Sequence, residues 1–395
     1  RLVAGIPLEE WQAYESNLDF PIEFIKMRLA EFDLPAGDKS WRLDRLEGLE
    51  NPVTVENLCA FYLSQVIKRS RQWIQTWRSE LIENYRVRWS ANIGVPAQYC
   101  DSPALKRFEY VLGLAWILSE SQVIDPFRWE TLDAQMMPYR QKLSALAKES
   151  LDCRAVPEIA AEVWSFIKSN SRREGHYAFY DVGDGTLDGG SFQYVVDEDG
   201  AKIDFFYAEV RPLGITAVAQ QLARELGLNE GETLEIVRAE TEDWPDNIRM
   251  TKNRKAIEKL VAKVVMKGKK NYKEHRPYGA LEDLRNGVRM FVGGGGSLIP
   301  DYRKTIMATH GDFQQDQAGI SKYIDIAIPY PRDLLTNGLE RDSFCRFAVA
   351  YGLSIPDGES PLIRLPTQMK EAVPDFAEWV PFNAENFENN IEGHS

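Results

Sequence analysis

The chain has 395 residues, 44% of them hydrophobic and 27% charged, which is the composition of a globular protein with a sizeable core. Its net charge of −13 argues against non-specific binding to nucleic acid or to an anionic membrane, since both need a positive field. The four cysteines and four histidines are scattered, so we expect a reducing, cytoplasmic setting and no zinc site. No apolar run reaches transmembrane length, and the total length predicts two lobes.

The first part of the chain is predicted to be mainly helical. In order, we expect an amphipathic segment at 22–32, one long or two joined helices over 55–89, a strand over 86–95, a helix over 103–122, and helical segments at 127–150 and 155–169. Trp73 and Trp77 lie four residues apart on one helical face. Core packing is the preferred explanation for this pair, and a partner surface is the alternative.

The rest of the chain is organised around residues 178–192. An apolar strand ends at Tyr180, a turn broken by glycines follows over 181–186, and a second strand runs to about Val196. Glycines in such a turn let backbone N–H groups approach an anion, and aspartates supply the oxygen ligands that Mg²⁺ prefers. An ordinary Asp-Gly hairpin turn has the same composition and remains an alternative.

Strands and helices alternate after this hairpin, which favours mixed α/β layers. We expect strands at 204–210, 288–292 and 324–328, helices at 214–226 and 253–266, and a buried helix at 344–353. The strand at 288–292 leads into the run Gly293, Gly294, Gly295, Gly296 and Ser297, with Pro300 after it. A flexible linker is the alternative explanation for four consecutive glycines. The basic runs at 68–71 and 267–273 are interpreted as solvated helix faces.

Three motifs together resemble one known superfamily. They are the strand end Ile93-Gly94-Val95-Pro96-Ala97, the turn from Asp181 to Asp188, and the glycine run from Gly293. Their order resembles that of the actin/DnaK-type ATPases, which include the ATPase domain of heat-shock chaperones, over roughly residues 90–355. The chain resembles a divergent bacterial-type member, and because it ends soon after residue 353 we expect no peptide-binding domain.

The resemblance implies an α/β fold with two ribonuclease H-like lobes and a nucleotide cleft between them. We expect the N-terminal part of lobe I, with insertions, at 1–170, and lobe II at 171–331. A helix returning to lobe I would occupy 332–369. An acidic C-terminal tail would occupy 370–395.

The resemblance also assigns roles to individual residues. Phosphoryl chemistry on ATP needs cradled phosphates, Mg²⁺ and a group that orients the attacking water. Asp181 would hold a Mg²⁺-bound water with support from Asp188, and Glu158 would orient the attacking water. Glu158 also fits ordinary helix capping, which stays open. The nucleotide-binding residues would be Gly183, Gly185, Thr186, Asp188, Gly214, Gly293, Gly294, Gly295, Gly296 and Ser297.

Four departures from the superfamily pattern bear on activity. Asp184 stands where a small residue is usual, and its carboxylate would repel a terminal phosphate. Gly214 stands where the superfamily has a pair of glycines that approach the phosphates, and only this one glycine is present. No lysine can be assigned to bind the phosphates. In the superfamily a first phosphate-binding loop precedes the strand end at 93–97, and nothing in 1–90 matches it. Either the chain as given lacks its native N-terminus, or the protein has lost one of its two phosphate-binding loops.

These observations predict an ATP-binding nucleotide switch with ATP or ADP and Mg²⁺ as ligands. Hydrolysis would be slow, and the switch would act on an unidentified protein partner, with segment 1–90 as a place for that partner to bind. A non-catalytic nucleotide-binding scaffold is the main alternative, and a small-molecule kinase of the same superfamily is the other. We expect neither nucleic acid nor a membrane among the partners.

Overall fold

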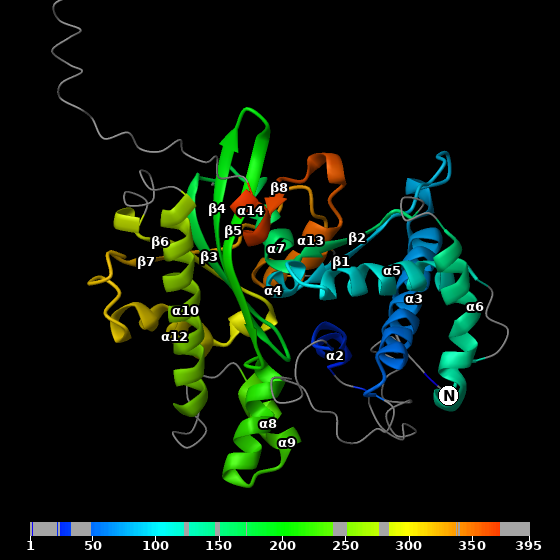
Figure 1. Cartoon of the computed structure of the whole chain (residues 1–395), viewed down its shortest axis with the longest axis horizontal. Helices are drawn as coiled ribbons and strands as arrows, with labels where there is room; N and C mark the ends of the chain where they lie inside the picture. The colour runs from blue at the N-terminus through cyan, green and yellow to red at the C-terminus, as the bar shows by residue number, and fades with distance from the viewer. Residues whose placement is uncertain are drawn as a thin grey trace, which may run out of the picture.

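The computed structural model describes residues 2, 22, 24–32, 49–121, 126–146, 151–170, 172–239, 251–275, 284–336, 338 and 340–371. Figure 1 shows the resulting arrangement of helices around the strands. Within the described ranges, the strands form a two-stranded sheet and a six-stranded sheet. This mixed architecture confirms the α/β class predicted from the sequence.

The smaller sheet pairs β1 (Ala91–Val95) with β2 (Cys153–Pro157) in parallel. Because parallel neighbours need a crossover, the chain leaves β1 through α4 (Ala97–Cys100) and α5 (Ala104–Glu120). Helices α3 (Pro52–Trp77) and α6 (Leu132–Ala145) pack against α5, and α2 (Ile25–Ala30) packs against both α3 and α5. The side chain of Asn51 caps α3 by accepting a hydrogen bond from Val53 N.

The larger sheet has the strand order β7-β6-β3-β4-β5-β8. Its strands are β3 (Gly175–Val182), β4 (Leu187–Asp197), β5 (Gly200–Arg211), β6 (Val288–Gly293), β7 (Tyr323–Ile326) and β8 (Leu362–Arg364). Strands β3, β4 and β5 form an antiparallel meander, whereas β6 runs parallel to β3. The carboxyl ends of β3 and β6 therefore lie at the same edge of the sheet.

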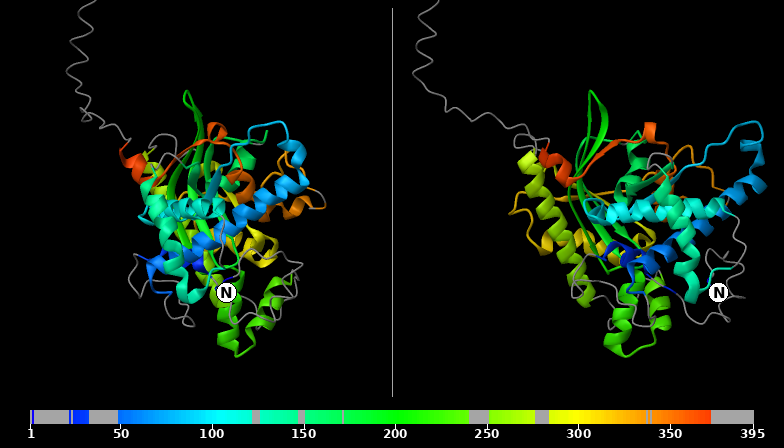
Figure 2. Two further views of the ribbon diagram at one scale, coloured as in Figure 1. Left: turned by 90° about the vertical axis from the view of Figure 1, so that its right-hand side faces the viewer. Right: turned by 45° about the vertical axis from the view of Figure 1, so that its right-hand side comes forward.

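Both faces of this sheet are buried. Successive side chains of a strand point to opposite faces, and those of β3 are buried on both. Tyr177 and Phe179 belong to a core cluster shared with α3, α5 and α7 (Glu158–Ile167). Ala178 and Tyr180 face the opposite way, into a core formed with the helices on the other side. These helices are α8 (Ile215–Leu226), α9 (Glu230–Arg238), α10 (Thr251–His275) and α12 (Pro300–Asp312). Figure 2 shows α10 and α12 on one side of the sheet and α5 on the other.

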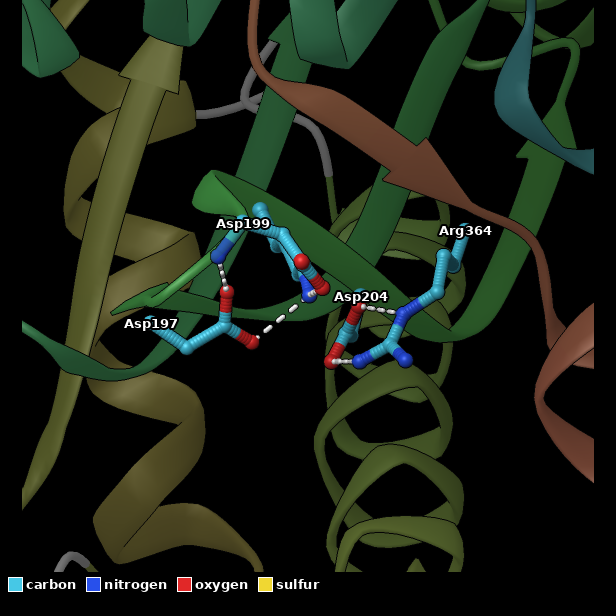
Figure 3. A network of polar contacts seen from close by, with 5 residues as sticks. Asp197, Asp199, Asp204 and Arg364 are labelled. Carbon is cyan, nitrogen blue, oxygen red and sulfur yellow. Dashed lines mark hydrogen bonds and ion pairs between the residues drawn. The ribbon is translucent and has the colours of Figure 1, made fainter. Parts of the chain in front are cut away.

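Ion pairs fix the edge of the large sheet at β5 and β8 (Figure 3). Arg364 on β8 donates from Nε to Asp204 Oδ1 at 2.6 Å, and its Nη2 bonds the other oxygen. At the hairpin between β4 and β5, Lys202 Nζ lies 2.7 Å from Asp197 and 2.8 Å from Asp199. Bidentate arginine–carboxylate pairs hold both position and orientation, so Arg364 holds the short strand β8 on β5.

Short helical segments complete the described chain. They are η1 (Ser79–Leu81), η2 (Trp129–Thr131), η4 (Gly295–Leu298), η5 (Arg341–Arg346), α13 (Ala348–Leu353), η6 (Asp357–Glu359) and α14 (Pro366–Glu371). None of the helices in the described part of the chain combines the length and apolar composition needed to span a bilayer.

Several elements differ from their predictions. Residues 153–157 form a strand, and the helix expected from 155 begins at Glu158. Residues 86–90 are irregular, so the strand expected over 86–95 is shorter. The helix expected over 344–353 is divided between η5 and α13, because Phe347 leaves the helical conformation. In addition, β8 and α14 lie where no element was expected.

Core packing is the wrong explanation for Trp73 and Trp77. Their exposed fractions are 54% and 71%. The buried residues of α3 end at Ser64 and Ile67 still packs on the core, so the last turns of this helix extend past the core. The predicted lobe boundaries remain predictions, and most of the tail expected at 370–395 lies outside the described residues.

Candidate functional site

The hairpin turn places two predicted metal-binding carboxylates opposite each other. Asp181 ends β3 and pairs in register with Asp188 at the start of β4. The turn between them is closed by Gly183 N donating to Thr186 O at 2.9 Å. Asp188 is 3% exposed, and Thr186 is the one cause near it that lowers the pKa of its carboxyl through a hydrogen bond. The Thr186 side chain, predicted to reach a phosphate, thus lies near the Asp188 carboxyl.

The glycine loop lies beside this hairpin because β6 is the parallel neighbour of β3. Gly293 pairs in register with Asp181, and the loop continues through η4. Gly294 has φ +76°, a conformation that side chains rarely adopt, and a Cβ there would overlap Asp181 Oδ1. Ser297 Oγ donates to Gly294 O at 2.7 Å and holds the loop closed. The two motifs predicted to bind one nucleotide are thus in direct contact.

Glu158 enters the same region from the first turn of α7, immediately after β2. Its side chain is 13% exposed and passes over Gly94 of β1, where a Cβ would lie 2.6 Å from Glu158 Cγ. The carboxylate forms an ion pair with Lys26 on α2. The structure brings Glu158 toward the hairpin carboxylates and adds Lys26, which no sequence motif indicates.

These carboxyls share a poorly solvated environment. Burial, together with the Glu158 charge, raises the pKa of Asp181 to about 7. Burial, then the charges of Glu158 and Asp181, raises the pKa of Asp188 well above its ordinary value. Burial alone would lower the pKa of Lys26, but Glu158 and Asp188 outweigh it and raise that pKa. The site is an acidic centre whose charge is opposed by a lysine.

Glu162 is a fourth carboxyl at this centre, one helical turn after Glu158. It is fully buried, and neither of its oxygens has a hydrogen-bond partner. A Cβ on Gly293 would lie 2.9 Å from Glu162 Oε1, so this carboxyl lies under the start of the glycine loop. Burial, followed by the Asp181 charge, raises the pKa of Glu162 well above its ordinary value. The sequence does not single out Glu162, because it lies among the apolar residues of a helix.

The negative charge of Asp184, which was expected to repel a terminal phosphate, is offset by neighbouring side chains in the structure. Thr216 Oγ1 at the start of α8 donates to Asp184 Oδ1 at 2.8 Å, and Arg238 Nη2 of α9 lies 3.3 Å from the same oxygen. The carboxylate is therefore engaged by α8 and α9. The backbone N–H of Gly214 donates to Gly185 O at 3.3 Å, so this predicted nucleotide-binding residue buttresses the turn.

The donor set fits a hydrated magnesium ion. Asp188 Oδ1 is buried and has no hydrogen-bond partner, which is the state of an oxygen left for a cation. Across the described residues, no group of three or more His, Cys, Asp or Glu side chains is placed to hold a metal. Mg²⁺ commonly takes one or two carboxylates and completes its shell with water and substrate phosphates. Asp181 and Asp188 match that pattern.

Fold and site together define an α/β protein with an acidic centre between a glycine-broken hairpin turn and a glycine-rich loop. No protein-family model matches the sequence, and no curated protein does either. Solved structures do resemble the chain, and an archaeal actin homologue is among them.

Three of these structures illustrate the similarity. The ethanolamine utilization protein EutJ from Carboxydothermus hydrogenoformans is 15% identical over 55% of this chain, with a TM-score of 0.30. The archaeal actin homologue Ta0583 is 16% identical over 51%, with a TM-score of 0.26. A non-polymerisable quadruple mutant of pCBH ParM is 14% identical over 63% of this chain and 74% of its own, with a TM-score of 0.32. The matches span 60% of EutJ and 54% of Ta0583. Because these TM-scores lie below 0.5, no residue here takes a role from them.

Proposed function

We propose that this protein is an actin-like nucleotide switch that binds Mg-ATP at the acidic centre and hydrolyses it slowly. The observation that carries the proposal is the contact between Asp181 and Gly294. It joins the end of β3 to the glycine loop, so one ligand can meet both. The backbone of 183–186 would cradle phosphates, and the loop from Gly293 to Ser297 would lie against the nucleoside.

The carboxylates would have two different roles, metal binding and activation of water. Asp181 and Asp188 would hold Mg²⁺ through water, and the ion when bound would neutralise charge on the phosphates. Glu158 would orient the attacking water and accept its proton. A protein partner would bind differently to the ATP-bound and ADP-bound forms. We propose that it contacts the exposed end of α3, where Trp73 and Trp77 lie.

Calorimetry with Mg-ATP, with phosphate release measured on the same sample, tests this function. Wild type is expected to bind ATP in a Mg²⁺-dependent manner, and Asp181→Asn is expected to weaken that dependence. Glu158→Gln is expected to keep binding and to abolish release. Arg88→Gln serves as control, because it breaks an ion pair with Asp152 on the exposed surface. Absence of Mg-ATP binding by wild type contradicts the proposal.

A non-catalytic scaffold is the second candidate, and the ion pair between Lys26 and Glu158 favours it. A carboxylate paired with a lysine has to leave that lysine before it can hold the attacking water. In that case, Mg-ATP binds and phosphate release stays at background in wild type and Glu158→Gln alike.

A further inference from the structure

Helix α10 concentrates positive charge in a protein that is acidic as a whole. Its 25 residues include nine lysines and arginines and two glutamates, whereas the whole chain has a net charge of −13. Lys259, Lys263, Lys267 and Lys270 follow one another at spacings of three or four residues, so they lie along one side of the helix. We call these four residues the lysine stripe.

Contacts with β5 show which side of α10 the stripe occupies. Lys263 Nζ lies 2.6 Å from Oε2 of the buried Glu209, and Lys267 Nζ lies 5.0 Å from the centre of the Tyr207 ring. Further along, the side chain of Lys270 is 75% exposed. The stripe therefore borders β5, and much of its charge faces the solvent.

Helix α14 brings the end of the described chain to the same place. Met369 of α14 is buried in a cluster with Phe206 of β5 and Tyr272 of α10. Thr367 N donates to Asp101 Oδ2 at 3.1 Å, which fixes the start of α14. Figure 2 shows α14, drawn in red, beside the end of α10. The residues that follow α14 therefore begin next to the last turns of α10.

Residues 372–395 carry the charge that complements the lysine stripe. They lie outside the described residues, and their sequence contains no lysine or arginine. Their acidic residues are Asp375, Glu378, Glu385, Glu388 and Glu392. At about 3.3 Å per extended residue, the chain from Met369 to Asp375 reaches roughly 20 Å. The stripe from Lys259 to Lys270 is about 16 Å long, so the segment can follow all of it.

We propose that residues 372–395 bind along the lysine stripe of the same molecule. Ion pairs between exposed groups are weak one by one, but attachment through α14 makes their formation an intramolecular step. A short linker of this kind gives an effective concentration in the millimolar range. The acidic segment thus covers the stripe and keeps other polyanions, such as nucleic acid, away from α10. This interaction does not depend on the nucleotide site.

Chymotrypsin digestion of the full chain, followed by mass spectrometry, measures how far the segment is protected. The cleavage sites are its aromatic residues Phe376, Trp379, Phe382 and Phe387. The double variant Lys267→Gln with Lys270→Gln removes two exposed charges and should speed cleavage about fivefold over wild type. Lys263 stays in place, because it pairs with the buried Glu209.

A second variant removes charge from the other partner. Asp375→Asn with Glu378→Gln should also speed cleavage about fivefold, after each rate is divided by that of a synthetic peptide 372–395 of the same sequence. Lys68→Gln with Arg69→Gln is the matched control, because it neutralises the basic run on α3 and should leave the rate unchanged.

Four results would overturn the proposal. They are cleavage of wild type as fast as that of the peptide, an unchanged rate in the Lys267/Lys270 variant, an equal increase in the α3 control, and protection that rises with protein concentration. The last would show that the segment binds a second copy of the chain. Thermal unfolding checks each variant, and if the Lys267/Lys270 variant does not fold, the Asp375/Glu378 variant decides. Both outcomes leave the proposed nucleotide switch unaffected.

Discussion

The Asp181 carboxylate lies against the α-carbon of Gly294, in the space that a side chain at Gly294 would fill. This contact follows from topology, since β3 and β6 are parallel neighbours and Asp181 pairs with Gly293. Ligands of open α/β sheets bind beyond the carboxyl ends of the strands. The contact therefore marks the edge at which we place the nucleotide.

Gly294→Ala is expected to destabilise the fold and to abolish nucleotide binding. The new methyl group meets Asp181 Oδ1 and the Val182 carbonyl at a positive φ, a strain of about 1–3 kcal/mol in the free energy of unfolding. Urea unfolding and calorimetry measure the two effects. Gly311→Ala is the control, because a Cβ there has no atom within 4 Å and it lies in α12. Equal behaviour of the two variants contradicts the close contact at Gly294.

Asp184→Asn is expected to leave the affinity for Mg-ATP nearly unchanged. Thr216 and Arg238 already engage the carboxylate, so its charge is offset before a phosphate arrives. The loss of the charged hydrogen bond should lower the free energy of unfolding by about 1 kcal/mol. Calorimetry and urea unfolding check both numbers. Binding more than roughly tenfold tighter in Asp184→Asn would instead support direct repulsion of the phosphate.

His176 should make the fold sensitive to acid. It is 2% exposed, lies 3.1 Å from Ser191 Oγ and stacks on Tyr272, and burial lowers its pKa to about 3. Because the unfolded chain takes up the proton first, stability is full above pH 6.5 and is lost as the pH falls toward 3. The loss between pH 7.5 and pH 5 should be about 2 kcal/mol.

Urea unfolding at these two pH values, for wild type and His176→Gln, isolates this contribution. The variant should lose less stability than wild type over the same interval, because glutamine does not titrate. Identical losses would show that His176 keeps its ordinary pKa in the folded protein.

Trp77→Ala should leave the fold almost unchanged, in contrast to Trp164→Ala. Trp77 is 71% exposed on the extended half of α3, so its loss should change the free energy of unfolding by about 0.5 kcal/mol or less. Trp164 is 4% exposed within the core cluster of α7, and its loss should cost about 3–5 kcal/mol. Comparable costs in urea unfolding would place α3 against another part of the protein.

The central hairpin and the glycine loop were predictable because their signals are local. An apolar run followed by Asp-Val-Gly-Asp-Gly-Thr predicts a strand and a turn, and the apolar run 288–292 before four glycines predicts a strand end. The same holds for α5 and α8, whose apolar spacing is long and regular. Strand β2 was missed because its five residues end in proline at a helix start and look like the helix itself.

The acidic centre was only partly predictable, because its members come from distant segments. Lys26 and Glu158 meet because α2 packs on α3 and α5. No local sequence pattern predicts that packing. Glu162 reads as one polar position on an apolar helix, and its burial depends on the sheet beneath it. Trp73 and Trp77 had helical spacing, but the sequence does not specify where α3 leaves the core.

Hydrogen exchange with and without Mg-ATP is the most direct test of the nucleotide site. Exchange should become slower in two separate segments, the turn at 183–186 and the loop from Gly293 to Leu298, and Mg²⁺ should be required for both. EDTA should remove the protection, and Asp181→Asn should weaken it in both segments together. Protection confined to one segment, or found only outside both, would contradict a single nucleotide bound between them.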